Sequence, residues 1–70
     1  MTEYKVTDVN GREIKRGDIV KNFRGEASRF GYVSRGPAVG KSAKVVVNIT
    51  ERDNGRELYA NVFDLTVEVL

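Results

Sequence analysis

Apolar and polar side chains alternate along most of this chain, and turn-forming residues interrupt the alternation at roughly every eight to twelve positions. This spacing is typical of short antiparallel strands. No long stretch has the apolar period of a helix. The sequence predicts strands at 3–9, 12–16, 19–24, 29–35, 43–50, 57–61 and 66–70, with a single helical turn at 62–65.

The strand at 43–50 is the most strongly indicated, because its β-branched run of valines resists helix formation and packs well in a sheet. Asn10-Gly11 and Asn54-Gly55 indicate two-residue hairpin turns, since both residue types tolerate a positive φ. The longest connection is predicted at 36–42, which contains two glycines and the only proline.

We therefore expect an all-β fold in a single domain, residues 1–70. It is a small SH3-like open barrel of five or six antiparallel strands, with one short helical turn near the C-terminus. An OB-type barrel fits less well, because it is usually longer and carries a helix between its third and fourth strands. The predicted core consists of Val6, Ile14, Ile19, Val20, Phe30, Val33, Val45, Val47, Ile49, Val62, Phe63, Leu65 and Val67.

The composition excludes several kinds of chemistry. The chain has no cysteine and no histidine, which rules out disulfides, the common zinc sites and a histidine-activated nucleophile. We expect no enzymatic activity and no cofactor. A chain of this size has a small core, so a homodimer is one way to add stability. The absence of cysteine, of a secretory signal and of a membrane-length apolar segment leads us to expect a cytoplasmic protein without membrane contact.

Charged residues are unevenly distributed along the sequence, and this distribution indicates a candidate binding surface. Residues 21–44 carry six basic side chains against Glu26 alone, a net charge of +5, whereas residues 45–70 carry −3. Basic side chains neutralise phosphates, and aromatic faces stack on unpaired bases. The predicted nucleic-acid-binding residues are Lys21, Phe23, Arg24, Arg29, Tyr32, Arg35, Lys41 and Lys44. The alternative is that this segment forms an ordinary solvated face.

Two glycines bear on this surface. Arg29 and Arg35 are expected to share a face with Gly31, whose missing side chain would permit close approach of a ligand. The segment 36–42 resembles a phosphate loop, but it has three residues between its glycines where four are needed, and it leads into a strand. Backbone amides near Gly40 could still contact one phosphate. The alternative is a plain hairpin loop.

Two resemblances extend this interpretation. Gly17-Asp18-Ile19-Val20, continuing through Gly25 to Gly31-Tyr32-Val33, resembles the KOW-type motif of small barrels associated with ribosomes and RNA polymerase. A second resemblance rests on Phe23-Arg24-Gly25-Glu26, Val33-Ser34-Arg35, Gly40-Lys41-Ser42-Ala43-Lys44-Val45 and Tyr59 with Val62-Phe63-Asp64-Leu65-Thr66-Val67. At these positions the chain resembles small uncharacterised proteins of actinobacteria and their bacteriophages. The second resemblance implies an actinobacterial or bacteriophage setting, and it implies no molecular mechanism.

Together these observations predict a non-catalytic accessory protein, phage-encoded by resemblance, that binds DNA or RNA weakly through its basic, aromatic-bearing segment. The alternative is a protein-interaction module that docks on a host protein or forms a homodimer. Its contact would be an exposed sheet edge or the loop at 23–26.

Overall fold

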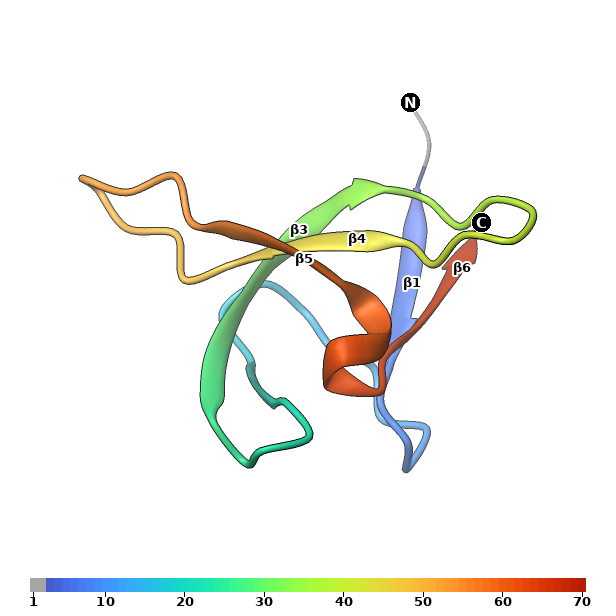
Figure 1. The fold of residues 1–70 in the computed structure, drawn as a ribbon, viewed down its shortest axis with the longest axis horizontal. Coiled ribbons are helices and arrows are strands. Elements are labelled where there is room, and N and C mark those ends of the chain that lie inside the picture. The colour runs from blue at the N-terminus through green and yellow to red at the C-terminus, as the bar shows by residue number, and fades with distance from the viewer. Residues whose placement is uncertain (1–2) are drawn as a thin grey trace.

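The computed structural model describes residues 3–70, so the first two residues of the predicted domain lie outside it. Its elements are β1 (Tyr4–Thr7), β2 (Ile19–Lys21), β3 (Ala27–Arg35), β4 (Lys44–Val47), β5 (Arg56–Tyr59), the 3-10 helix η1 (Ala60–Phe63) and β6 (Thr66–Val69). The strands form two antiparallel sheets, β1-β6 and β2-β3-β4-β5 (Figure 1). The all-β prediction is confirmed, and the two sheets do not close into one barrel.

Strand β3 organises the larger sheet. Its first residues pair with β2, and its remainder, from Phe30 onward, pairs with β4. The register shifts at two points, so that Gly31 and Ser34 are extra residues opposite β4. Such bulges bend a strand and increase its twist. In Figure 1 the green ribbon of β3 accordingly curves around the molecule from the β2 side toward β1.

The core lies between the two sheets and η1. It consists of Val6, Ile14, Val20, Phe30, Ala43, Val45, Val47, Ala60, Phe63 and Leu65, with Val33, Leu58, Val62 and Val67 packed against it. All the core residues except the two alanines were predicted. The alanines lie where η1 meets β4, and the Ala60 N–H donates to the Ala43 carbonyl at 2.8 Å. A larger side chain at either position would separate these two elements.

Two predicted core residues lie elsewhere. Ile19 is 48% exposed, because it precedes the buried Val20 and therefore points to the opposite face of β2. Ile49 is half-buried on the outer side of the sheet, where a side chain at Gly31 or at Gly55 would meet its atoms. The predictions of Ile19 and Ile49 as core residues were wrong because apolarity alone does not identify the face.

The Asn10-Gly11 pair does not form a two-residue turn. Gly11 has φ +80°, whereas Asn10 has no positive φ. The Asp8 carboxylate instead accepts the backbone N–H groups of Asn10 and Arg12, each at 2.9 Å, which widens the loop to residues 8–12. The loop at 22–26 has the same design, in which the Asn22 side chain accepts two backbone N–H groups.

The β4–β5 connection also differs from the predicted Asn54-Gly55 hairpin. β4 ends at Val47, three residues before the predicted end of the strand, because Asn48 adopts a positive φ of 61°. The chain bends at residues 51–52, and the Thr50 N–H donates to the Asp53 carbonyl across the bend at 2.8 Å. Only Gly55 of the predicted pair has a positive φ.

Two further boundaries moved. The strand predicted at 12–16 is reduced to one bridge between Glu13 and Thr7, followed by an Ile14 N–H that donates to the Val6 carbonyl at 2.8 Å. The helical turn occurs at η1, two residues before its predicted position, and Asp64 ends it in the left-handed conformation. No helix within residues 3–70 is long and apolar enough to cross a membrane.

The contact at Gly31 makes a testable prediction about stability. A Cβ there would lie 2.6 Å from the Val46 carbonyl oxygen and 2.5 Å from the Ile49 Cδ1. The backbone atom cannot move aside without disturbing the sheet, so we expect Gly31→Ala to lower the free energy of unfolding by about 1–3 kcal/mol, the usual cost of overpacking.

The matched control is Gly36→Ala, whose Cβ would meet first the far end of the Tyr4 side chain. That half-buried ring can rotate, so the control should cost less. Urea unfolding of both variants measures the difference. Equal stabilities would show that the bulge at Gly31 is not held by this contact.

Candidate nucleic-acid interface

Most of the predicted binding residues share one face of the larger sheet, which we call the outer face. Core residues alternate with side chains that point away from the core, and each predicted residue on these strands belongs to the second set. The outer face carries Lys21 on β2, Arg29, Tyr32 and Arg35 on β3, and Lys44 on β4. The structure thus brings five of the eight predicted residues onto one surface.

The register gathers three side chains into one row at the end of this face. Lys44 pairs with Arg35 on one side and with Tyr59 on the other. The Lys44 Nζ lies 5.1 Å from the centre of the Tyr59 ring and 3.4 Å from the Glu57 Oε1. Lys44 is therefore held between a carboxylate and an aromatic ring, while Tyr59 remains 47% exposed.

The pKa of the Glu57 carboxylate is lowered by its neighbours. A hydrogen bond from the Ser34 hydroxyl is the largest cause that lowers its pKa below the ordinary value of 4.5, and Lys44 and Arg35 add to it against partial desolvation. The Ser34 Oγ also lies 3.2 Å from the Lys44 carbonyl oxygen. The hydroxyl has one proton, and a charged carboxylate is a stronger acceptor than a carbonyl oxygen, so we assign the hydrogen bond to Glu57.

A hollow of about 280 Å³ adjoins the row. It is lined by Arg35, Gly40, Lys41, Ser42, Tyr59 and Asn61. The Arg35 guanidinium donates to the Ser42 carbonyl at 3.2 Å, which fixes its position beside Lys41. No carboxylate lines the hollow, so its electrostatic character is set by two cations. Chemically it can hold an anion next to an aromatic ring.

Phe23 and Arg24 lie apart from this row. They occupy the loop before β3, and the nine residues of β3 separate them from the end at Arg35, a path of about 25–30 Å along the strand. The Arg24 guanidinium carbon lies 5.5 Å from the centre of the Phe23 ring, and this ring is 75% exposed. They can extend a binding surface but do not belong to the row.

The expected role of the glycines is not supported by the structure. The space beside Gly31 is occupied by Ile49 and the Val46 carbonyl, so it admits no ligand. At 38–41 the two terminal residues exchange backbone hydrogen bonds, and the Lys41 N–H donates to the Ala38 carbonyl at 2.9 Å. The hairpin-loop interpretation therefore holds here, and the Lys41 amide is already engaged within the chain.

Sequence reasoning missed Tyr59, which lies in the acidic part of the chain. Its one signal was an aromatic residue within a predicted strand. Only the β4–β5 register shows that Tyr59 lies beside Lys44 and near Arg35.

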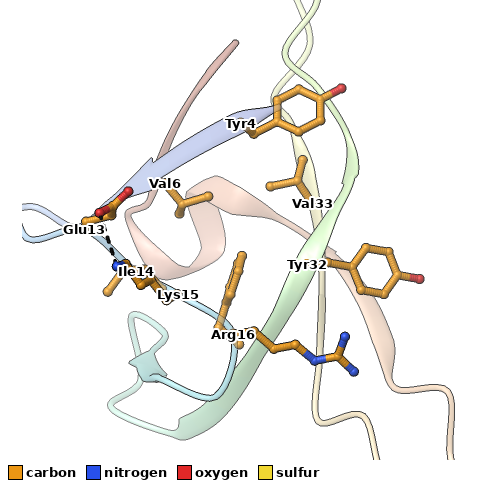
Figure 2. Close-up of a pocket in the computed structure, with 9 residues that line it drawn as sticks. Tyr4, Val6, Glu13, Ile14, Lys15, Arg16, Tyr32 and Val33 are labelled. Carbon is orange, nitrogen blue, oxygen red and sulfur yellow. Dashed lines mark ion pairs between the residues drawn. The ribbon is translucent and has the colours of Figure 1, made fainter. Parts of the chain in front are cut away.

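A second concave feature lies between the sheets. This groove, of about 410 Å³, separates β1 from β3 and has Val6, Ile14, Phe30 and Val33 among its lining residues. Figure 2 shows Val6 and Val33 facing each other across it, while Tyr32 points away from β1. The edge of β1 away from β6 has no strand neighbour before the bridge at Thr7.

Three charged residues, Glu13, Lys15 and Arg16, also line the groove. Glu13 and Lys15 form an ion pair at 3.9 Å, and Arg16 has no carboxylate partner within the described part of the chain. No three carboxylates among residues 3–70 lie close enough together to hold a metal ion.

Comparison of this chain with protein-family models, curated proteins and solved structures finds no match. The KOW-type and actinobacterial resemblances stay predictions.

The Ser34–Glu57 contact yields a prediction about pH. Because the folded-state pKa of Glu57 is lowered, its contribution to stability is present above the ordinary glutamate range and is lost as the pH falls through the folded-state pKa. We expect Ser34→Ala to raise the pKa of Glu57 back toward 4.5. Carboxyl ¹³C shifts recorded against pH measure it, with Glu51 as the internal control. An unchanged Glu57 midpoint would assign the shift to Lys44 instead.

Proposed function

We propose that the outer face binds nucleic acid, mainly through its phosphates. The observation that carries this proposal is that most cations of this face and of the adjoining hollow have no carboxylate partner in the described part of the chain. Within residues 3–70 there are three ion pairs, Arg12–Asp8, Lys15–Glu13 and Lys44–Glu57. Lys21, Arg29, Arg35 and Lys41 therefore keep their charge available to a polyanion.

An ordinary solvated face would interleave both signs of charge. Here Lys44–Glu57 is the one ion pair among residues 3–70 that joins the basic segment 21–44 to the acidic segment 45–70, so most cations of the basic segment are not neutralised by it. Two exposed tyrosines, Tyr32 and Tyr59, lie among the cations and offer aromatic surface. Cations and aromatic rings on one face are the usual composition of a nucleic-acid-binding surface.

The arrangement of the sheets supports the SH3-like topology as part of this proposal. The last strand returns to pair with the first, and a 3-10 turn precedes it. The open seam between β1 and β3 then corresponds to an incompletely closed barrel. We propose an accessory role in the predicted actinobacterial or bacteriophage setting.

Salt dependence tests the proposal. With three or four phosphate contacts, log affinity for duplex DNA should fall against log salt with a slope of about −3. Lys41→Gln should weaken binding and reduce that slope by about 1. Fluorescence anisotropy of a labelled duplex measures both quantities.

The matched control is Lys5→Gln, which removes the same charge from an exposed position on β1, outside the outer face. It should leave the affinity and the slope almost unchanged. Binding that does not respond to salt, or equal effects of the two variants, would contradict phosphate recognition by this face.

The groove between β1 and β3 favours a second candidate, docking of an extended polypeptide with apolar and acidic side chains. Val33 and the buried Val6 and Phe30 give it an apolar floor, and the edge of β1 away from β6 has no strand neighbour before Val6 among residues 3–70. Arg16, without a carboxylate partner in the described region, selects for acidic residues.

A heptapeptide of alternating glutamate and leucine is a suitable probe for this candidate. Amide shifts at Val6 and Val33 that Arg16→Gln weakens would support docking at the groove. A lysine-leucine heptapeptide that binds equally well, or an absence of shifts at both valines, would contradict it.

A further inference from the structure

The hollow beside Tyr59 has the composition of a site for a single nucleotide. Its lining combines two cations, a serine, an asparagine and a tyrosine ring, in a volume of about 280 Å³. Arg35 and Lys41 are suited to a phosphate, and a tyrosine ring is suited to a base. This inference rests on the proposed function and specifies the form of nucleic acid that the outer face takes.

The position of the Tyr59 ring supports base stacking. Tyr59 is the last residue of β5, the edge strand of the larger sheet, and its side chain is outside the core cluster. The Lys44 ammonium covers one face of the ring at 5.1 Å. Tyr59 is 47% exposed and lines the hollow, so its aromatic surface is accessible to a base held there.

Neighbouring contacts hold this platform in place. Glu57 fixes Lys44 through the 3.4 Å ion pair, and Ser42 fixes Arg35 through its carbonyl. The binding groups are therefore partly ordered before a ligand arrives, which lowers the entropy lost on binding. Asn61 adds an amide that can donate to or accept from a base edge.

Duplex nucleic acid cannot use such a site fully. Its bases are paired and stacked inside the helix, so it presents only phosphates and groove edges to a protein surface. An unpaired nucleotide can place its base on Tyr59 while its phosphate contacts Arg35 and Lys41. We propose that the hollow binds one unpaired nucleotide, and that the outer face thereby selects single-stranded over double-stranded nucleic acid.

Three labelled DNA probes test this proposal by fluorescence anisotropy at one salt concentration. They are a deoxythymidine octamer, an octamer of the same charge with abasic sites at every position, and a blunt-ended duplex without unpaired nucleotides. Charge density alone favours the duplex. We expect the deoxythymidine octamer to bind most tightly, and to exceed the abasic octamer by at least about fivefold.

Substitutions then locate the effect. Tyr59→Leu should weaken binding of the deoxythymidine octamer at least about fivefold and leave the abasic octamer unchanged, because stacking needs both partners. Tyr59→Phe keeps the aromatic ring and should retain the affinity. Tyr32→Leu should weaken binding of the deoxythymidine octamer less than Tyr59→Leu does, since Tyr32 is an equally exposed tyrosine on the same face but outside the hollow. Unchanged urea unfolding shows that the variants are folded.

The outcomes separate the two proposals. Equal affinities for the two octamers, or a Tyr59→Leu effect of equal size on both, would overturn the single-nucleotide site. The nucleic-acid proposal would survive that result if Lys41→Gln still weakened every probe. If none of the three probes binds, the proposed function fails, and the single-nucleotide site fails with it.

Discussion

The pairing of β3 with β4 is the interaction on which the rest of the structure depends. β4 places Val45 and Val47 in the core with no exposed surface, and it is the strand through which β5 joins the sheet. The bulges opposite it bend β3, so that one strand can pair with β2 at its start and reach past β1 at its end. The same bend spreads Arg29 and Arg35 along a single outer face.

The stability of so small a core is sensitive to packing defects, since the chain has no cysteine and its described residues form no metal cluster. Close approach between elements compensates for size. Ala43 and Ala60 let η1 contact β4 directly, and Gly31 lets Ile49 cover the outside of β3. These small residues stabilise the fold by letting neighbouring elements pack closely. A prediction based on large apolar side chains therefore did not identify them.

The strands and most of the core were predictable, because alternation and β-branched residues are local signals. The hairpins were not, because the Asp8 carboxylate binds backbone N–H groups and widens the first loop, and Asn48 with its positive φ ends β4 before the second Asn-Gly pair. The basic side chains of the outer face were found from composition. Tyr59 was missed because its neighbours are set by strand register, which depends on contacts far apart in sequence.

Glu57 places a carboxylate on the face that we propose binds a polyanion. It removes one net charge, which weakens long-range attraction, but it holds Lys44 over Tyr59 at a fixed position. Without it, Lys44 would be a mobile cation able to contact any phosphate. The acidic half of the chain therefore supplies both the aromatic ring and the group that orders its cation. Under the proposed function, this arrangement lowers the nonspecific affinity of Lys44 for phosphates and favours ligands that place a base on the Tyr59 ring.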